Sequence, residues 1–552
     1  MKKVLIIILS LSFFFSCEIK GVSSHSKEES KTLTYILKSD NNAFHAIKYC
    51  GYTLIDSISY NDEHYFLIGC PQSQSISFIL EKLNDFCKVD WIELEQKRNL
   101  FDENSGFEFP TYFNSYQSFY DVSRLRDTIT KFGFGTYLPT VVIIDTGLNL
   151  KHIEFNDPQF FSGYSCYRRS EDGTTTLINS LETITLDGEA YNGVSSFEKM
   201  SNETNWDGNP KEGHGSHVAG IIAGYKKMLG SCGGHCNVIG YKTFANDKTG
   251  KGLSSSGGNY SVYSALLHYL SQKTDGKTAV VNMSFGALSP SKFEAEVLSI
   301  AVKNNLLLVA ATGNQSKLEC EFPATFNYVM AVTAANWDGS VTSFSSRNPT
   351  ASVSAVGKNV FSVKGSSNDE YCYMEGTSMA TPFVAGCAAY LLSLAPTLTV
   401  GELRTIIEDG AQDKGEMGHD SQYGYGLVDL FNSAEMAVEH QKYIDSAGVS
   451  GSAIKSRYSS LPVSVFVYKE VLVSGVAEKV PLVGNIIYLY KIDKSDSSKF
   501  NFYSVGVVQN DGFCSFPLLE EGSYRFALQN SYLEFDFDFS APLTNLELQV
   551  AP

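Results

Sequence analysis

Four short apolar runs constrain the fold of the middle of this chain more than any other feature. Each run is apolar along almost its whole length, so we expect both faces of the segment to be buried. Runs of this kind are typical of strands in a parallel sheet that helices cover on both sides. They lie at residues 141–144, 279–283, 306–310 and 329–332. The pattern predicts an α/β domain with a mainly parallel sheet over residues 120–440.

Two further folded parts flank this domain, and 552 residues are enough for all three. The apolar spacing over residues 31–100 changes period repeatedly and predicts the order βαββαβ, a ferredoxin-like arrangement. Residues 101–119, rich in Asn, Ser, Glu and aromatic residues, are predicted to form a linker. A second linker at 441–462 leads to residues 463–552, where the alternation of apolar and polar residues predicts a small all-β sandwich.

Acidic residues alternate with phenylalanines from 534 to 539, near the C-terminus. Calcium ligands are one interpretation, but one solvated face of a half-buried strand explains the pattern more simply. Asn510-Asp511-Gly512 predicts a hairpin turn between two other strands.

Residues 1–17 have the features of an export signal. Met1-Lys2-Lys3 precedes an apolar run, Val4 to Phe15, of 12 residues, which is too short to span a bilayer. Cys17 follows Ser16 and leads into a polar tether at 18–30, which resembles a bacterial lipoprotein signal and implies lipidation of Cys17. The alternative is a plain secretory signal with an incidental cysteine. We therefore expect an exported protein, anchored to the outer or cytoplasmic membrane at the cell surface or in the periplasm, or else secreted.

The net charge of the chain limits the classes of molecule that it can bind. The 60 acidic residues against 43 basic ones give a net charge of −17, and no basic cluster interrupts the excess of acid. Such a chain repels phosphate backbones, which excludes nucleic acid as a partner.

The 11 cysteines are too few to build a disulfide scaffold. Cys232 and Cys236 flank Gly-Gly-His and suggest half of a metal site, but no matching second pair exists. A loop disulfide or two free thiols explain this pair more simply.

Polar residues lie where the predicted strands end, the edge at which α/β sheets bind ligands. Asp145 directly follows the first run, and Asn314 follows the third. Ser378 precedes a helix-forming run at 383–394, with Pro382 expected in the first turn of the helix. Taken singly, a turn aspartate and an N-capping serine are unremarkable.

His214 lies among small residues that allow another segment to approach it closely, and His217 follows one helical turn later. Two histidines at this spacing suggest zinc. The glutamate of an H-E-x-x-H motif and an acidic third ligand are both absent from this stretch, so we do not expect a metal here.

Taken together, Asp145, His214, Asn314 and Ser378 occur in that order within nearly complete local motifs. The chain reads G-T-S-M-A-T-P-F-V-A-G from Gly376 and H-G-S-H-V-A-G from His214. On these motifs it resembles the subtilisin-like serine proteases. The segments Val281 to Gly286 and Tyr423 to Asp429 are similar to the substrate-pairing strand and the closing motif of that family.

The resemblance implies an Asp-His-Ser triad. Ser378 would be the nucleophile, His214 the general base and then acid, and Asp145 the carboxylate that orients His214. Asn314 and the backbone N–H of Ser378 would hold the oxyanion. The chemistry would need no cofactor.

The resemblance also implies two segments that bind extended protein or peptide substrates as an added β-strand. The residues of these segments and of the strand end before Asn314 are Ser284, Phe285, Gly286, Gly252, Leu253, Ser254, Ala311, Thr312 and Gly313.

The part at 31–100 resembles the family's propeptide, which implies a folding aid and intramolecular inhibitor that is removed autocatalytically. We expect cleavage between Leu100 and Gln117. The part at 463–552 resembles carboxypeptidase-regulatory or transthyretin-like modules.

The chain departs from compact members of the family between Asp145 and His214, which are 69 residues apart with a polar insertion at 156–205. Glu154 lies where a family calcium carboxylate often falls, so structural calcium is an expectation. Glu319 and Glu321 lie where the primary specificity pocket is lined, and a carboxylate there would favour lysine or arginine in substrates; solvent-facing glutamates are the alternative.

The sequence thus predicts an exported serine endopeptidase that is made as an autoprocessed zymogen. The alternative from another class is a catalytically inactive subtilisin fold that serves as an adhesin or scaffold. All four catalytic positions hold competent residues, which favours the enzyme.

Overall fold

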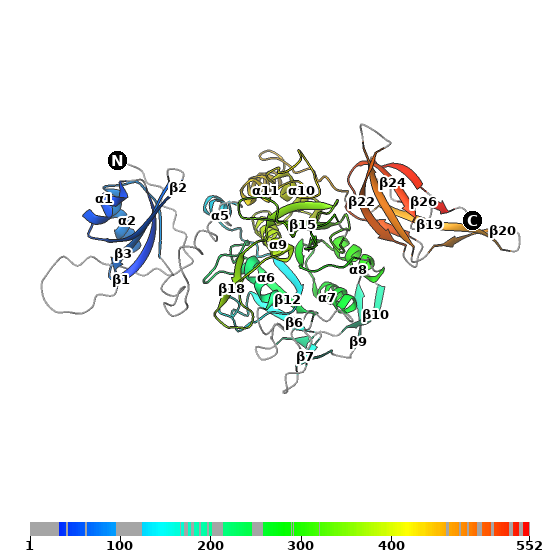
Figure 1. Ribbon diagram of the computed structural model, residues 1–552, viewed down its shortest axis with the longest axis horizontal. Helices are drawn as coiled ribbons and strands as arrows, with labels where there is room; N and C mark the ends of the chain where they lie inside the picture. The colour runs from blue at the N-terminus through cyan, green and yellow to red at the C-terminus, as the bar shows by residue number, and fades with distance from the viewer. Residues whose placement is uncertain are drawn as a thin grey trace. The chain divides into compact units, whose positions relative to one another are not determined.

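The structure is a computed structural model. It describes residues 32–39, 42–60, 63–94, 124–165, 167–169, 175–177, 181–186, 189–195, 198–200, 213–244, 258–288, 290, 292–318, 321–459, 463–473, 476–482, 485–493, 499–508, 513–528, 534–539 and 545–550. The chain divides into two compact units, residues 1–109 and 110–552 (Figure 1). The division lies inside the stretch that the sequence predicts to be a linker.

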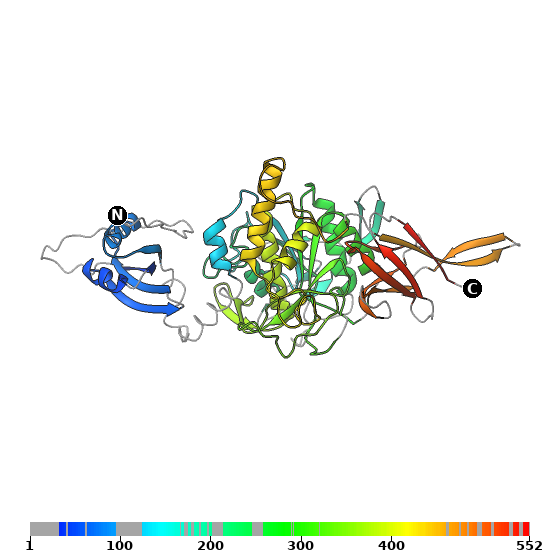
Figure 2. The ribbon, with the colours of Figure 1, turned by 90° about the horizontal axis from the view of Figure 1, so that it is seen from above.

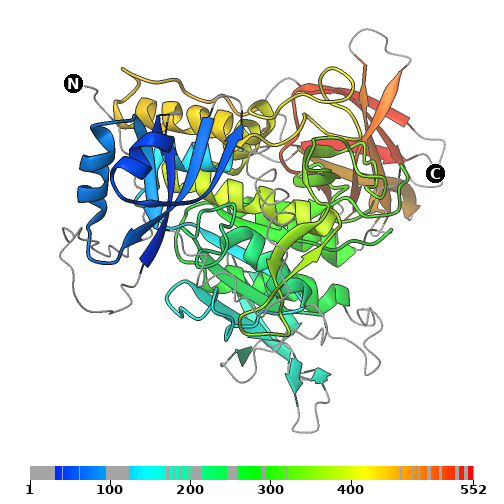
Figure 3. The same cartoon turned by 60° about the vertical axis from the view of Figure 1, so that its left-hand side comes forward.

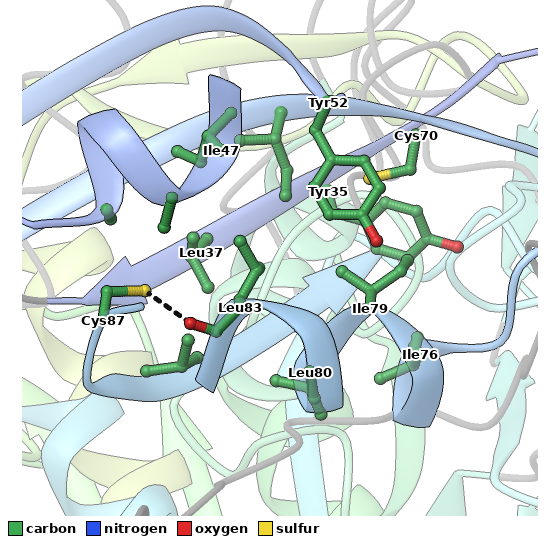
Figure 4. Packing of buried hydrophobic residues seen from close by; sticks show 14 residues of the cluster. Tyr35, Leu37, Ile47, Tyr52, Cys70, Ile76, Ile79, Leu80, Leu83 and Cys87 are labelled. Atoms are coloured by element: carbon green, nitrogen blue, oxygen red, sulfur yellow. Dashed lines mark hydrogen bonds between the residues drawn. The ribbon is translucent and has the colours of Figure 1, made fainter. Parts of the chain in front are cut away.

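The first unit has the predicted βαββαβ order. Its elements are β1 (Thr32–Ser39), α1 (Ala43–Tyr49), β2 (Thr53–Tyr60), β3 (Glu63–Pro71), α2 (Ile76–Asn84) and β4 (Val89–Leu94). The strands form an antiparallel sheet in the order β2-β3-β1-β4. Figure 4 shows Ile79 and Leu83 of α2 beside Tyr35 and Leu37 of β1, in one buried apolar cluster.

The second unit contains an eight-stranded sheet in the order β11-β6-β12-β5-β13-β14-β15-β16. Seven of these strands run parallel, and β11 pairs antiparallel with β6 at one edge. The strands are β5 (Thr140–Asp145), β6 (Phe161–Ser165), β11 (Glu198–Lys199), β12 (Asn237–Lys242), β13 (Ala279–Met283), β14 (Leu306–Ala311), β15 (Val329–Ala335) and β16 (Ala351–Val356). The predicted α/β class with a mainly parallel sheet is confirmed.

The four apolar runs form β5, β13, β14 and β15, which are adjacent in the middle of the sheet. The strands β6 and β12 nearer the edge alternate between buried and half-buried positions, so their sequences lack a continuous apolar run. The strand β16 is fully buried but contains Ser352 and Ser354. Pattern analysis therefore finds the centre of the sheet and misses its flanks.

Helices pack around this sheet (Figures 1 and 2). Two of them, α6 and α9, pack against each other and against the central strands, and α7 and α8 form a second packed pair. The helices are α5 (Leu125–Phe132), α6 (His214–Ala223), α7 (Gly258–Gln272), α8 (Lys292–Lys303), α9 (Thr377–Leu394), α10 (Val400–Asp409) and α11 (Leu430–Asp445). Among the described residues, α9 alone has the length and hydropathy of a membrane span, and it is 89% buried as the core helix of this domain.

Short antiparallel hairpins complete the domain. They are β7 (Tyr167–Arg169) with β8 (Thr175–Leu177), β9 (Leu181–Leu186) with β10 (Glu189–Ser195), and β17 (Val360–Val363) with β18 (Tyr371–Met374). The first two belong to the polar insertion between Asp145 and His214 and lie at the margin of the domain (Figure 3).

The helix α9 corrects one expectation. It begins at Thr377, so Pro382 lies inside the helix and not in its first turn. The residue before the helix, its N-cap, is Gly376, whose φ is 149° and ψ is 164°, and the helix begins earlier than the apolar run at 383–394 suggests. A φ in this range strongly favours glycine.

The C-terminal part is a sandwich of two β-sheets, as predicted. One sheet contains β20-β19-β23 with β26 paired to β19, and the other has the order β22-β21-β24-β25. Apolar residues from both sheets form one buried cluster. The strands are β19 (Val463–Val473), β20 (Val476–Pro481), β21 (Ile486–Ile492), β22 (Phe500–Val507), β23 (Phe513–Phe516), β24 (Gly522–Leu528), β25 (Glu534–Phe539) and β26 (Asn545–Val550).

The strand β25 resolves the two interpretations of its acidic residues. Phe537 and Phe539 are buried, while Asp536 and Asp538 are exposed and contact Arg525 and Ser523 of the neighbouring strand β24. The acidic residues therefore form the solvated face of a half-buried strand. The predicted turn at Asn510-Asp511-Gly512 lies outside the described residues.

Polar contacts join the sandwich to the α/β domain. The backbone N–H of Asn327 donates to Oγ of Ser504 at 2.9 Å, and its side-chain amide donates to the carbonyl of Pro517 at 2.6 Å. Asn327 also accepts from Arg404 of α10 through its backbone carbonyl. Because these groups are buried, they fix the sandwich to the domain at specific positions.

Candidate active site

Three neighbouring parallel strands bring the predicted polar residues to one edge. The strand β5 ends at Asp145, β13 ends just before Ser284, and β14 ends shortly before Asn314. The three strands are adjacent in the order β5-β13-β14. Since all three run in the same direction, their carboxyl ends, and the residues that follow them, lie at the same edge of the sheet.

Asp145 and His214 form a hydrogen-bonded pair. Nδ1 of His214 lies 2.8 Å from Oδ1 and 3.0 Å from Oδ2 of Asp145. Asp145 is 3% exposed, and its Oδ1 also accepts from the backbone N–H of Thr146 at 2.7 Å. A buried carboxylate on Nδ1 holds the proton there, which leaves Nε2 to accept a proton from another group.

Gly215 makes this approach possible. A Cβ atom on Gly215 would lie 2.3 Å from the carbonyl oxygen of Gly147 and 3.1 Å from Cβ of Asp145. The backbone N–H of Gly215 donates to Oγ1 of Thr146 at 2.9 Å, which ties the start of α6 to the turn after β5. Thr146 is thus a positioning residue for the pair.

His217 serves a different purpose from His214. Its ring is fully buried, and Nε2 lies 3.3 Å from the backbone carbonyl of Cys372. Burial, together with the nearby charge of His214, lowers the pKa of His217 to about 3. The two histidines contact different partners, and no group of three metal-ligating side chains occurs in the described part of the chain. His217 therefore stays neutral in the core beneath the site.

Ser378 is the second residue of α9 and exchanges two hydrogen bonds with Ser284. Its Oγ donates to the backbone carbonyl of Ser284 at 3.0 Å, and Oγ of Ser284 donates to the backbone carbonyl of Ser378 at 2.9 Å. Asn282 holds Oγ of Ser284 from the strand side at 3.0 Å. The positive end of α9 lies at Ser378, where it stabilises negative charge.

The position of Pro382 explains why the Ser378 carbonyl is available to Ser284. In a regular helix this carbonyl would accept from the N–H four residues later, which is residue 382. Proline has no N–H. The hydroxyl of Ser284 takes that place, so Pro382 contributes to the geometry around the nucleophile.

Asn314 is held through its oxygen. Its Oδ1 accepts from the backbone N–H of Thr377 at 2.9 Å and from Oγ1 of Thr377 at 3.0 Å. The amide is therefore oriented with Nδ2 as the donor, and a Cβ on Gly376 would lie 3.1 Å from Nδ2 of Asn314 and 3.6 Å from N of Ser378. Nδ2 of Asn314 and N of Ser378 thus lie close together, an arrangement that could donate to an oxyanion.

The edge carries a serine hydroxyl at the start of a helix, two nitrogen donors beside it and an imidazole oriented by a buried carboxylate. This combination on a parallel α/β sheet defines a serine peptidase.

Comparison with known proteins gives the family. The model of the subtilase family matches residues 139–426, which is more than half of the chain. The chain belongs to the subtilase family of serine endopeptidases.

Individual relatives agree with this assignment. The chain is 34% identical to subtilisin DY of Bacillus licheniformis over 235 residues, which cover 42% of this chain and 80% of that protein. It is 34% identical to the minor extracellular protease Epr of Bacillus subtilis over 217 residues, which cover 39% of this chain and 32% of Epr. The crystal structure of fervidolysin from Fervidobacterium pennivorans, a keratinolytic enzyme related to subtilisin, shares the fold, with a TM-score of 0.56 and 16% identity over 99% of this chain and 80% of that chain.

The remaining predicted site residues fall into two groups. Phe285 and Gly286 follow Ser284 at the carboxyl end of β13, and Ala311, Thr312 and Gly313 lead from β14 to Asn314. Gly252, Leu253 and Ser254, on the other predicted side of the substrate, lie outside the described residues, as does Cys17.

Glu154 is not arranged as a metal ligand. It is fully buried, and its two carboxylate oxygens accept hydrogen bonds at 2.6–2.7 Å from the backbone N–H groups of Tyr225, Lys226 and Lys227 and from the hydroxyl of Tyr371. With two donors on each oxygen, the residues around Glu154 do not fit a calcium ion. Glu154 instead holds the segment that follows α6.

Cys232 and Cys236 are free thiols whose Sγ atoms lie 2.8 Å apart in the core. Burial, followed by the neighbouring Cys232, raises the pKa of Cys236. The Cys236 thiol therefore stays protonated, which leaves it without the reactive thiolate form.

Sequence analysis missed the contributions of Thr146, Thr377 and Pro382. Thr377 and Pro382 lie within the motif that starts at Gly376, yet their roles depend on contacts with segments more than 60 residues away. The only sequence signal for Thr377 and Pro382 was that both belong to the motif that starts at Gly376.

Proposed function

We propose that this subtilase is an exported endopeptidase that cleaves extended segments of proteins, and that it is made as a zymogen whose N-terminal unit inhibits the active site until it is removed. The observation that carries the proposal is the pairing of buried Asp145 with His214 at the same sheet edge as Ser378 and Asn314.

The first half of the reaction uses groups of the chain and the substrate. Oγ of Ser378 forms a bond to the carbonyl carbon of the substrate while its proton passes to Nε2 of His214. Nδ2 of Asn314 and N–H of Ser378 donate to the resulting oxyanion. The C–N bond then breaks as His214 returns the proton to the leaving amine, and an ester remains on Ser378.

Water completes the cycle. It attacks the ester carbon and gives one proton to His214, which passes the proton back to Oγ of Ser378 as the ester bond breaks. The products are a free amine and a carboxylic acid. Asp145 stabilises the imidazolium in both halves of the reaction.

Two observations support the zymogen and export parts of the proposal. The first unit is a compact body of its own and has the propeptide-like order βαββαβ. Residues 1–17 have the form of an export signal, and the related Epr is named as an extracellular protease. We propose that Cys17 is lipidated and anchors the protein to a membrane, that cleavage occurs in the linker between Leu100 and Gln117, and that the C-terminal sandwich is a carboxypeptidase-regulatory or transthyretin-like module.

The experiment compares the chain from Glu18 onward as wild type, as Ser378→Ala and as Ser450→Ala, an exposed serine that serves as control. Intact mass and casein hydrolysis are followed together. We expect wild type and Ser450→Ala to lose the first unit and to digest casein, whereas Ser378→Ala stays full length and inactive. Loss of the first unit from Ser378→Ala would contradict self-processing. Absence of casein hydrolysis and of labelling by a serine-directed inhibitor in wild type would overturn the proposal.

A further inference from the structure

Cys232 and Cys236 bring their sulfur atoms unusually close together. The two Sγ atoms lie 2.8 Å apart, and the side chains are 0% and 1% exposed. Even unbonded carbon atoms, which are smaller than sulfur, pack best at about 3.5–4.0 Å. The sulfur atoms of a disulfide lie about 2.05 Å apart, so a movement of less than about 1 Å separates the two thiols from bonding distance.

The backbone between the two cysteines is built to bring them together. Gly233 and Gly234 have φ angles of 66° and 73°, in the left-handed region that favours glycine. The N–H of His235 donates to the carbonyl of Cys232 at 3.2 Å, which closes the turn. The chain therefore reverses between Cys232 and Cys236, and their side chains meet although only three residues separate them.

The turn joins elements that carry the active site. The N–H of Cys232 donates to the carbonyl of Ile222 in α6, the helix that begins with His214, at 2.9 Å. On the other side, a Cβ atom on Gly386 of α9 would lie 3.1 Å from N of Cys232. The strand β12 begins directly after Cys236 and pairs with β5. A bond between the two sulfur atoms would therefore fix the connection from α6 to β12.

We propose that Cys232 and Cys236 form a disulfide bond while the exported chain folds, and that this bond fixes the connection between α6 and β12. The inference rests on the proposed export, because disulfides persist in oxidising compartments, and it does not depend on the peptidase activity. The oxidant is a disulfide of the glutathione class. Both S–H bonds break, one S–S bond forms, and the oxidant is reduced to two thiols that receive the two hydrogens.

The bond has to form before the turn is buried. Thiol–disulfide exchange needs a thiolate that the oxidant can reach. In the folded chain both cysteines are buried, and burial raises the pKa of the Cys236 thiol. The reaction therefore belongs to the folding chain and not to the finished domain.

The test uses the chain from Glu18 onward as Ser378→Ala, so that it does not digest itself. The reduced, unfolded protein is refolded in a mixture of oxidised and reduced glutathione, free thiols are alkylated in denaturant, and the protein is digested with trypsin. The peptide from Met228 to Lys242 contains Cys232 and Cys236 and no other cysteine. Its mass distinguishes an unlabelled peptide that is two hydrogens lighter from one that carries two labels.

The variants in this background are Cys236→Ser, which removes one partner, and Cys387→Ser, which removes another buried thiol on α9. We expect the lighter, unlabelled peptide in the parent and in Cys387→Ser, and a labelled Cys232 in Cys236→Ser. A peptide with two labels in the refolded parent would overturn the disulfide. A peptide that links Cys232 to Cys387 would overturn the pairing.

Two further measurements test when the bond forms and what it does. Oxidant added to protein that has already folded in the reduced form should act much more slowly, and equal rates would overturn formation before burial. Reductant should raise the equilibrium constant of unfolding by about tenfold to a hundredfold in the parent and leave it unchanged in a Cys232→Ser/Cys236→Ser variant. An equal response of both proteins would overturn the stabilising role. None of these outcomes depends on catalysis or on where the chain is exported, so failure here would leave the proposed function standing.

Discussion

Ser284 and Ser378 exchange hydrogen bonds in both directions, each hydroxyl donating to the backbone carbonyl of the other residue at 2.9–3.0 Å. One bond holds the hydroxyl of Ser378, and the other compensates the helical hydrogen bond that Pro382 cannot make. The end of β13 is thereby fixed to the first turn of α9. If Ser378 is the nucleophile that we propose, a displacement of either segment would misplace it, and small displacements of this kind cost much of the rate.

This arrangement predicts coupling between Ser284 and Pro382. In the inactive Ser378→Ala background, Ser284→Ala should destabilise the fold by about 1–3 kcal/mol, because the carbonyl of residue 378 loses its partner. Pro382→Ala supplies an N–H at the position that this carbonyl would use in a regular helix. The double variant should therefore be more stable than the sum of the single changes by about 1 kcal/mol, measured by denaturant unfolding. If the changes in the free energy of unfolding were strictly additive, Ser284 and Pro382 would not be coupled through the carbonyl of residue 378.

Thr377 should act on turnover through Asn314. Asn314→Ala removes a side-chain donor to the oxyanion and should lower kcat by about 10²–10³ with little change in KM. Thr377→Val removes the hydroxyl that fixes Oδ1 of Asn314, and we expect a smaller loss of about tenfold in kcat, since the backbone N–H of Thr377 still holds that oxygen. Thr377→Ser retains the hydroxyl and serves as the control. A KM effect in place of a kcat effect would argue for a role in ground-state binding.

The buried pair of Arg404 and Glu408 should be sensitive to the loss of one partner. Nε of Arg404 lies 2.8 Å from Oε1 of Glu408, and both side chains are almost fully buried. Glu408→Gln leaves the guanidinium charge uncompensated and should lower the free energy of unfolding by about 3–5 kcal/mol. The matched control is Glu435→Gln, which breaks the exposed pair with Lys131 and should cost at most about 1 kcal/mol. Equal losses of unfolding free energy in Glu408→Gln and Glu435→Gln would show that burial does not determine the cost of losing one partner of a charged pair.

His217 should make the fold less stable in mild acid. Its pKa is about 3 in the folded protein, against about 6.5 in an unfolded chain. Below pH 6.5, the unfolded state therefore binds more protons than the folded state. The contribution of neutral His217 to the free energy of unfolding is fully present above this pH and is lost as the pH falls towards 3. The slope from this group approaches about 1.4 kcal/mol per pH unit.

Denaturant unfolding of Ser378→Ala between pH 7 and 4.5 measures this effect, with His217→Gln in the same background as the comparison. We expect the variant to show a shallower fall in stability with decreasing pH. Identical slopes in the two proteins would mean that other groups dominate acid sensitivity.

We expect the precursor to cleave itself in the predicted linker, so the mature chain should begin between Leu100 and Gln117. N-terminal sequencing of mature wild type and of Ser378→Ala tests this.

A mature N-terminus before Leu100 or after Gln117 would show that processing does not occur in the linker. Comparison with Ser378→Ala separates cleavage by the chain itself from cleavage by another protease.

Much of the fold was predictable because its signals are local. The four buried runs require strands that are covered on both faces, and they form the centre of the sheet. The alternation around Phe537 likewise indicates one buried face. The edge strand β6 was missed because a strand that is partly exposed carries a mixed pattern, which short turns and loops share.

The candidate catalytic residues were identifiable as a set from their order in family motifs. Their contacts were not, because a hydrogen bond between residues 69 or 94 positions apart leaves no local trace in either segment. Glu154 likewise shows that the position of a residue in the sequence does not reveal its contacts. Its place in the sequence suggested calcium, while the fold surrounds its oxygens with four donors.

The sequence by itself determined the class of fold, the family and the candidate reacting groups, because periodicity and side-chain chemistry are properties of short segments. The tertiary structure alone decided that Pro382 leaves a carbonyl to Ser284, that Thr377 orients Asn314 and that Glu321 lies against Gly286 and Gly313. These relationships depend on how the ends of β13 and β14 and the start of α9 meet, and that meeting is fixed by the packing of the whole domain.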